Sequence, residues 1–253
     1  MNPETTTALV TGASSGLGEE YVRQLAPRYE RIIAVARRVD RLESLAIELA
    51  SERADIVPLQ ADLATLEGQA RAVECIRQQG PVGMLVNNAG FGSFGPFIED
   101  DIDRDLAMLR LHQEAVLLLT RTALPAMRDA GGGYIINVAS VGAFLPMPGS
   151  AVYAASKAFL NSFSVSLQSE VERFGIRVQS LCPGFTHTEI HDSPDMRGFD
   201  KSRTPEGLWM SAEEVVSESL AALDAGHVLL VPGDMNRTMV ASALDEERAL
   251  FRQ

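Results

Sequence analysis

The sequence predicts an α/β fold of the Rossmann-like type, a doubly wound parallel sheet with helices on both faces. Three observations lead to this prediction. Short apolar runs alternate with longer segments of helical periodicity, the runs lack the polar alternation of half-exposed strands, and a glycine-rich turn follows the first run. In such sheets ligands bind beyond the carboxyl ends of the strands, so site residues are expected where each run ends.

Seven apolar runs are expected to form strands, and six segments between them to form helices. The expected strands are residues 6–12, 31–37, 55–60, 83–88, 134–140, 177–183 and 227–232. The expected helices are residues 16–27, 39–52, 65–79, 102–128, 152–174 and 212–225. No repeat, low-complexity tract or long linker interrupts this alternation, so residues 1–253 are expected to form a single domain.

The composition is typical of a soluble globular chain with a sizeable core. Of the 253 residues, 46% are apolar and 22% are charged. The net charge of −12 argues against a nucleic-acid partner or an anionic membrane surface. There is no apparent secretory signal and no apolar run long enough to span a membrane, so we expect a cytoplasmic protein. Cys75 and Cys182 are too few for a disulfide framework and are expected to be free thiols.

The glycine-rich turn TGASSGLG follows the first expected strand and opens the first helix. Gly12, Gly16 and Gly18 allow a tight turn and a close approach of backbone to a pyrophosphate, and the helix N-terminus offers free N–H groups. The spacing G-x-x-x-G-x-G differs from the G-x-G-x-x-G fingerprint. Taken alone, the turn is therefore also compatible with an ordinary strand-to-helix connection.

The end of the second expected strand indicates which dinucleotide would bind. An acidic residue there accepts hydrogen bonds from a ribose 2′-hydroxyl, whereas an arginine favours a 2′-phosphate. Ala36 stands where the acid is expected, Arg37 and Arg38 follow, and Arg41 is a further candidate. Because a guanidinium matches phosphate geometry, we expect NADP(H) to be preferred over NAD(H), with Arg37 as the contact. A pair of solvated arginines is the alternative.

Acid–base chemistry is suggested by a group of three residues further along the chain, Ser140, Tyr153 and Lys157. Tyr153 and Lys157 are four apart, so on a helix they share one face, and a nearby ammonium would lower the high pKa of a tyrosine. Such a pair can donate and accept a proton near neutral pH. Ser140 ends an expected strand, where its hydroxyl could bind a substrate oxygen or form a turn.

These motifs, in this order on one chain, resemble the short-chain dehydrogenase/reductase family. TGASSGLG matches its cofactor loop, NNAG (87–90) the motif after its fourth strand, Ser140, Tyr153 and Lys157 its catalytic triplet, and PGFTHT (183–188) the segment beside the nicotinamide. The resemblance covers about residues 6–188, and 211–232 looks like the family's last helix and strand. It implies one NAD(P)-binding domain with a seven-stranded sheet of order 3-2-1-4-5-6-7.

The resemblance also implies an activity, hydride transfer between nicotinamide and a carbonyl or alcohol carbon. Tyr153 would be the general acid or base, Lys157 would bind the nicotinamide ribose and lower the tyrosine pKa, and Ser140 would steady the substrate oxygen. Carried over by position, cofactor contacts are expected at Gly12, Ser14, Ser15, Gly16, Leu17, Gly18, Arg37, Asp62, Leu63, Asn88, Ala89, Gly90, Tyr153, Lys157, Pro183, Gly184, Thr186 and Thr188.

The chain departs from the family at His112. The segment LRLHQEAVLLLTR reads as a helix, and His112 lies on its apolar side with Val116 and Leu119. Many members carry a catalytic asparagine eight residues before a Thr-Arg pair, in a helix that is kinked there. Thr120 and Arg121 form that pair, which puts His112 at the asparagine position. It is a candidate catalytic residue that replaces asparagine structurally, relays protons, or marks weakened catalysis.

The segment that follows Pro183 is expected to form a substrate-binding loop at 186–210. Its polar, proline-bearing sequence lacks periodicity, and Met196, Phe199, Trp209 and Met210 would either line a pocket or pack the loop against the body. With Phe144 and Leu145 they suggest a hydrophobic carbonyl substrate. His187, Glu189 and His191 alternate along the loop, but nothing supplies a helical HExxH geometry, so no metal site is expected.

Two functions were weighed. The first is an NADP(H)-dependent reductase of ketones or aldehydes, or an alcohol dehydrogenase, and the second is a catalytically weak or inactive NADP(H)-binding sensor or scaffold. The triplet Ser140, Tyr153 and Lys157 favours the enzyme, and His112 alone favours the rival. The resemblance further implies a homodimer or homotetramer formed through the apolar helices near 102–128 and 152–174.

Overall fold

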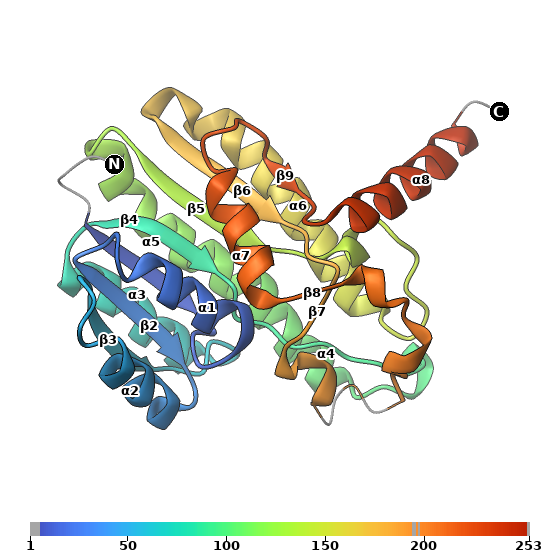
Figure 1. Cartoon of the computed structure of the whole chain (residues 1–253), viewed down its shortest axis with the longest axis horizontal. Helices are drawn as coiled ribbons and strands as arrows, with labels where there is room; N and C mark the ends of the chain where they lie inside the picture. The colour runs from blue at the N-terminus through green and yellow to red at the C-terminus, as the bar shows by residue number, and fades with distance from the viewer. Residues whose placement is uncertain (1–5, 194–195, 197, 252–253) are drawn as a thin grey trace.

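The computed structural model describes residues 6–193, 196 and 198–251, which form a parallel sheet between two layers of helices. The strands of the main sheet are β1 (Thr7–Thr11), β2 (Arg31–Ala36), β3 (Asp55–Gln60), β4 (Val82–Asn87), β5 (Gly133–Val138), β6 (Ile176–Leu181) and β9 (Leu229–Leu230). Their order in space is β3-β2-β1-β4-β5-β6-β9 (Figure 1). This confirms the predicted order, with β9 as the seventh strand.

The strands bury side chains on both faces, as the unbroken apolar runs predict. In β1, Ala8 and Val10 point into one core cluster while Leu9 points into the other. Ile32 and Ile33 in β2 divide between the two clusters in the same way. Because successive side chains of a strand alternate between faces, each run must be apolar throughout to serve two cores.

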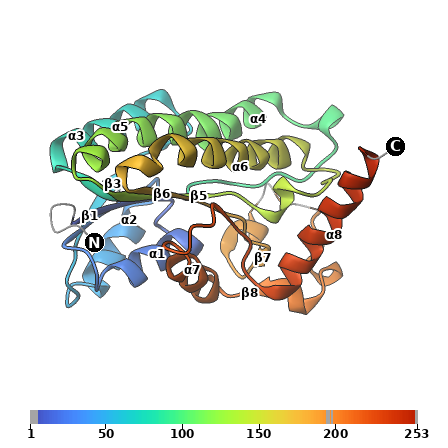
Figure 2. The same ribbon diagram turned by 90° about the horizontal axis from the view of Figure 1, so that it is seen from above.

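Helices cover both faces of the sheet. They are α1 (Gly16–Leu25), α2 (Val39–Glu48), α3 (Leu66–Gln79), α4 (Ile102–Leu109), α5 (Ala115–Asp129), α6 (Ala151–Val171), α7 (Ala212–Ala221) and α8 (Asp234–Leu250). Figure 2 shows α3, α4, α5 and α6 on one face and α1, α2 and α7 on the other. None of the described helices is both long and apolar enough to cross a membrane.

Three features of the fold differ from the elements expected along the sequence. Helix α8 was not predicted, and it extends away from the sheet (Figure 1). The expected helix 102–128 is α4 and α5 joined by a π-helical turn, Arg110–Glu114. Within the expected loop 186–210, the short strand β8 (Trp209–Met210) pairs in parallel with β7 (Phe185–Thr186). Residues 194, 195 and 197 of that loop lie outside the described residues.

A buried chain of hydrogen bonds joins α1, α7 and β6 on one face. The Tyr21 hydroxyl donates to Ser219 Oγ at 2.6 Å, and Ser219 Oγ donates to Gln179 Oε1 at 2.5 Å. The Gln179 side-chain amide returns a hydrogen bond to the Ser219 carbonyl at 3.1 Å. Each of these side chains is almost fully buried, so the chain satisfies polar groups that water does not reach.

Candidate active site

The glycine-rich turn after β1 is folded tightly onto the end of β4. Gly12 has φ of +68°, a conformation that favours glycine. A Cβ on Gly18 would collide with the Gly12 carbonyl, and it would lie 2.5 Å from the Asn88 side-chain nitrogen. The turn therefore leaves no space for a side chain at Gly18, and α1 begins directly after it, at Gly16.

Asn88 and Ala89, which are expected near the cofactor ribose, form hydrogen bonds that join the end of β4 to this turn. The Thr11 hydroxyl oxygen accepts both of their backbone N–H groups at 2.9 Å. The Asn88 side-chain amide donates to the Thr11 carbonyl at 2.8 Å. The Asn88 amide group is thus engaged in holding the loop, a structural task that the residue pattern alone does not reveal.

The two residues expected at the adenine also have local partners. The Asp62 carboxylate accepts the Ala64 N–H at 3.0 Å, which closes a turn before α3. The Leu63 side chain is 4% exposed and belongs to a core cluster. The Leu63 side chain is therefore packed into the core, so a cofactor contact at this position would come from its backbone.

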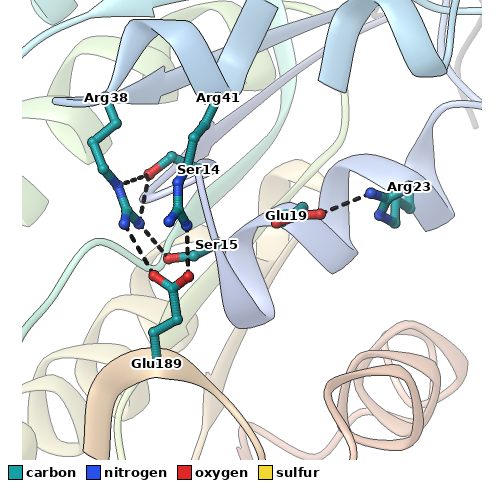
Figure 3. Close-up of polar contacts among 7 residues, drawn as sticks. All are labelled: Ser14, Ser15, Glu19, Arg23, Arg38, Arg41 and Glu189. Carbon is teal, nitrogen blue, oxygen red and sulfur yellow. Dashed lines mark hydrogen bonds and ion pairs between the residues drawn. The ribbon is translucent and has the colours of Figure 1, made fainter. Parts of the chain in front are cut away.

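A group of hydrogen-bond donors suited to an anion lies beside the glycine-rich turn, and it includes Arg38, the neighbour of the expected contact Arg37. Arg38 donates to Ser14 Oγ at 3.2 Å and to Ser15 Oγ at 2.8 Å, whereas the Arg37 carbonyl accepts from the Gln60 side chain. Both arginines are exposed. The structure thus places Arg38, not Arg37, against the loop. The reason is local: Arg38 is the residue before α2, and its side chain turns back across the loop (Figure 3).

A carboxylate completes this group. Glu189 Oε2 accepts from Arg38 at 3.0 Å, and Glu189 Oε1 accepts from Arg41 at 2.6 Å (Figure 3). Hydrogen bonds from Arg41 and Arg38 lower the pKa of Glu189. Glu189 lies about 150 residues away from both arginines along the chain, so its contact with them cannot be predicted from local spacing.

Ser140, Tyr153, Lys157 and His112, predicted as catalytic, lie together beyond the end of β5. Lys157 Nζ is 5.6 Å from the Tyr153 ring centroid and donates to the Val138 carbonyl at 2.8 Å. Tyr153 forms a hydrogen bond with Ser140, and the His112 ring lies edge-on to the Tyr153 ring at 6.0 Å between centroids. The fold thus brings a phenol, an ammonium and a hydroxyl to one place.

Burial sets the protonation of this cluster. It lowers the pKa of Lys157 to about 8. Burial also raises the pKa of Tyr153, and the hydrogen bond with Ser140 only partly opposes this. Desolvation of the phenolate is thus the larger of the two effects on the pKa of Tyr153.

His112 lies in the π-helical turn between α4 and α5, with 1% of its surface exposed. Its Nδ1 is 2.8 Å from Ser156 Oγ, and its Nε2 accepts the Phe91 N–H at 3.3 Å. The ring also needs Gly90, since a Cβ there would lie 2.7 Å from Nε2. The kink implied by the family resemblance is thus present as an extra-wide turn that holds this ring.

The hydrogen bonds determine the tautomer of His112. Ser156 donates its one hydroxyl hydrogen to the Tyr153 carbonyl at 2.7 Å, so its oxygen accepts from Nδ1–H. Nε2 is then the acceptor that meets the Phe91 N–H. Burial, with a smaller contribution from the Lys157 ammonium, lowers the pKa of His112 well below its usual value. Both nitrogens of the ring thus have partners, and burial and these contacts favour its neutral form.

The segment that follows β6 passes beside the residues after β5 and beside the glycine-rich turn. The Pro183 carbonyl accepts the Val141 N–H at 2.9 Å, and Thr186 is buried with its hydroxyl on the Gly184 carbonyl. Thr188 packs over Gly16, at 3.0 Å from the place of a Cβ. A neighbour that the sequence analysis missed is Asn236 of α8, 1% exposed, whose side chain leaves no space for a Cβ on Gly184.

The aromatic residues of the substrate loop pack on one another. Phe185 lies 5.3 Å from Trp209 and 5.7 Å from Phe199 between ring centroids, and His191 contacts both of these rings. His187 stacks on Trp209 at 4.9 Å. His187 and His191 thus both contact the Trp209 ring, whereas Glu189 pairs with Arg38 and Arg41. The described residues hold no group of three or more metal-ligating side chains.

An open cleft of about 710 Å³ separates the glycine-rich turn from the substrate loop. Its lining includes Ser15 and Gly16 on one side and His187, Glu189 and Trp209 on the other. The cleft is therefore placed to accept a ligand that lies along the start of α1 and reaches toward the carboxyl ends of the central strands.

Comparison with known proteins agrees with this architecture. The family model for short chain dehydrogenase matches residues 6–196. A short chain dehydrogenase of Pseudocercospora fijiensis is 35% identical over 193 residues, which are 75% of this chain and 62% of that protein. The chain thus spans less than two thirds of that relative's length.

Solved structures of similar fold cover nearly the whole chain. A short-chain dehydrogenase from Sphingobium yanoikuyae in complex with NADPH has a TM-score of 0.85 and 32% identity, over 97% of this chain and 94% of that one. A bulky-bulky ketone specific alcohol dehydrogenase from Comamonas testosteroni has a TM-score of 0.79 and 28% identity, with the same two coverages of 97% and 94%.

Proposed function

This chain belongs to the short chain dehydrogenase family of oxidoreductases, and from that premise we propose that it is an NADP(H)-dependent reductase of ketones or aldehydes. The observation that supports this proposal best is the cluster beyond β5, where the Tyr153 and Ser140 hydroxyls are hydrogen-bonded and the Lys157 ammonium lies 5.6 Å from the centroid of the tyrosine ring. When bound, the nicotinamide supplies the hydride. The chain itself supplies the proton and the positioning.

The residues beside the glycine-rich turn fit a phosphorylated dinucleotide. Arg38, Arg41, Ser14 and Ser15 form a compact set of donors, and a carboxylate already lies between the two arginines. A 2′-phosphate offers more charge and more acceptor oxygens to the same donors. This supports NADP(H) over NAD(H), with Arg38 in the role first given to Arg37. The Sphingobium yanoikuyae dehydrogenase, which was solved with NADPH, supports the same choice.

In reduction, Tyr153 would donate its hydroxyl proton to the carbonyl oxygen, and Ser140 would hold that oxygen by a hydrogen bond. The raised pKa of Tyr153 keeps the phenol protonated, which is the form a general acid requires. Lys157, with its pKa near 8, would carry its charge beside the cofactor ribose at neutral pH. The residues of the cluster thus divide proton donation, substrate orientation and cofactor binding among them.

His112 would position the cluster without transferring protons. Its hydrogen bonds to Ser156 and Phe91 employ both ring nitrogens, and its lowered pKa opposes a proton relay near neutral pH. Through Ser156 it holds the Tyr153 carbonyl, so the ring fixes the first turn of α6. Of the three interpretations, this supports structural replacement of asparagine.

The substrate is proposed to be a ketone or aldehyde with hydrophobic substituents, bound between the cluster and the substrate loop at 186–210. Phe144 and Leu145 are partly exposed beside Ser140, and Phe199 and Trp209 belong to the loop's aromatic group. A largely apolar wall with a few polar groups is typical of sites for such substrates. The Comamonas testosteroni enzyme, described as specific for bulky-bulky ketones, supports this class.

The decisive experiment measures NADPH oxidation with a panel of ketones, aldehydes and quinones. We expect activity that falls about 100-fold or more in Tyr153→Phe, since general acid catalysis contributes that much. Tyr134→Phe is the matched control, because its hydroxyl contacts Asp224 at the far end of β5. A full rate in Tyr153→Phe would refute the mechanism. Tight NADPH binding with no turnover on any substrate would favour a sensor or scaffold.

We also propose that the chain forms a homo-oligomer through α5 and α6. Leu117 and Leu118 on α5 and Val165 on α6 are each more than 40% exposed, at 42%, 41% and 44%. Apolar side chains gathered on neighbouring helices favour burial against another surface. Light scattering of the purified protein would show a dimer or tetramer, and a monomer at micromolar concentration would contradict the proposal.

A further inference from the structure

The contact between Glu189 and the two arginines has a consequence for cofactor selection. The carboxylate reaches across from the segment after β7 to residues at the start of α2, and each of its oxygens meets a different guanidinium. Arg38 at the same time donates to both Ser14 and Ser15. One anionic group therefore lies at the point where donors from two loops converge.

These donors are the ones that would bind a ribose 2′-phosphate. Ser14 and Ser15 accept from Arg38, so their own hydroxyl hydrogens remain free to be donated to an anion. A carboxylate resembles a phosphate to a guanidinium, since both accept two parallel N–H bonds. Glu189 and a 2′-phosphate would thus compete for Arg38 and Arg41.

We propose that Glu189 is an internal substitute for the 2′-phosphate: it occupies Arg38 and Arg41 in the free chain, and a 2′-phosphorylated nucleotide must displace it. This rests on the proposed preference for NADP(H). Glu189 then determines how strongly the site distinguishes the two cofactors, because a nucleotide without the 2′-phosphate leaves the two ion pairs in place.

The exposure of the three side chains makes displacement feasible. Arg38, Arg41 and Glu189 have relative side-chain exposures of 42%, 43% and 54%, so water can replace each partner as it leaves. Ion pairs of this exposure are weak, and a phosphate with up to two negative charges can outcompete a single carboxylate. The competition therefore weakens binding of the phosphate without preventing it.

Displacement would also free the chain around Glu189. Its neighbour Thr188 packs over Gly16, and Glu189 begins a short 3₁₀ turn that ends at Asp192. The two arginine contacts join this turn to the far side of the cleft. Loss of those contacts removes a link between the turn and α2, so the backbone near residue 189 should exchange its amide hydrogens faster.

The test uses two nucleotide fragments, ADP-ribose and its 2′-phosphate, with calorimetry on the wild type and on Glu189→Gln. We expect Glu189→Gln to bind the 2′-phosphate form about fivefold more tightly, as the loss of two exposed ion pairs permits, and ADP-ribose to change less than about twofold. Glu19→Gln is the matched control. It removes the same charge from the same cleft, but Glu19 pairs with Arg23.

The two proposals can fail separately. If the wild type binds both fragments equally, or neither, the NADP(H) preference fails and this inference fails with it. If the wild type prefers the 2′-phosphate form but Glu189→Gln changes its affinity no more than Glu19→Gln does, only the role of Glu189 is overturned.

Hydrogen exchange gives an independent readout. In the wild type, the 2′-phosphate form should increase amide exchange in peptides covering residues 187–193, whereas ADP-ribose should not. Glu189→Gln should show the faster exchange without any ligand, and Glu19→Gln should not. Equal exchange with both fragments in the wild type would contradict displacement of Glu189.

Discussion

At the scale of single residues, His112 is a buried titratable ring whose polar atoms are all satisfied. The ring donates to Ser156 and accepts from Phe91, and no water is required to complete its hydrogen bonds. Its neutral form is built into the fold, because a proton added to Nε2 would face the donating N–H of Phe91. This arrangement connects the protonation of one side chain to the stability of the native state.

The stability of the protein should therefore depend on pH through His112. The pKa of this ring in the folded state is well below the value of about 6.5 expected when unfolded, so the unfolded chain binds more protons below that pH. The free energy of unfolding should fall as pH decreases below 6.5, by up to about 1.4 kcal/mol per pH unit from this residue.

Denaturant unfolding of the wild type and His112→Asn between pH 5 and 7.5 measures this contribution. His112→Asn should show a shallower slope, while His227→Asn, which changes an exposed histidine, should match the wild type. Parallel pH profiles for the wild type and His112→Asn would show that the ring takes up protons equally in the folded and unfolded states, and would contradict the lowered pKa.

Gly90 offers a second test at this scale. An alanine Cβ at this position would lie 2.7 Å from His112 Nε2, so Gly90→Ala should cost about 1–3 kcal/mol of stability through overpacking. His112→Asn should relieve part of this cost in the double variant, which a double-mutant cycle measures. Gly95→Ala is the control, because nothing lies within 4 Å of its Cβ position. Additive costs for Gly90→Ala and His112→Asn would contradict the contact.

The residue pattern identified the right types of residue but not all of their partners. The arginine next to the glycine-rich turn is Arg38 and not Arg37, since a neighbouring pair differs only in the direction in which the chain turns into α2. Spacing offered one signal: Arg38 and Arg41 are three apart and so share a face of the helix start. The contact of both with Glu189 depends on the tertiary fold, which no local pattern contains.

At the scale of elements, the sequence predicted every strand of the main sheet and the helices between them. Unbroken apolar runs in the strands and apolar spacing in the helices carried enough information for these predictions. The residue pattern did not predict the π-helical turn, because a regular α-helix would also bury Met108, His112, Val116 and Leu119. Helix α8 was not predicted because it has little apolar periodicity. Its main buried residues are Val240 and Asn236.

The packing of α1 against α7 gives a prediction at this scale. Tyr21→Phe removes the donor to Ser219 Oγ while it retains the ring that fills the core, so the free energy of unfolding should fall by about 1 kcal/mol. Urea unfolding followed by circular dichroism would measure the loss. Tyr134→Phe removes a more exposed hydrogen bond and should cost less. A neutral Tyr21→Phe would show that the buried hydroxyl contributes nothing.

At the scale of the whole molecule, a chain with a net charge of −12 is expected to bind an anionic cofactor. Local donors must therefore act against an unfavourable overall field, which makes the convergence of Arg38 and Arg41 on one point important. Because ligand binding to the native state stabilises the whole cooperative unit, the cofactor should be detectable through unfolding of the entire protein.

Thermal unfolding with each cofactor tests this expectation. At a concentration 100 times its Kd, NADPH should add about 2.7 kcal/mol to the free energy of unfolding. For a chain of this length that corresponds to a rise in Tm of about 5–10 °C. NADH at the same concentration should give a smaller rise. An equal or larger shift with NADH would contradict the proposed preference.

The Cys182 thiol is fully buried and donates a hydrogen bond to the Asn161 side chain. It lies where β6 meets the segment that passes the active site. Burial raises its pKa to about 12, so almost no thiolate is present at neutral pH and alkylating reagents cannot reach it. Labelling of Cys182 thus requires this part of the sheet to open, so the labelling rate measures how often that opening occurs. The protein carries its own chemical probe of local unfolding, at a position that needs no engineered cysteine.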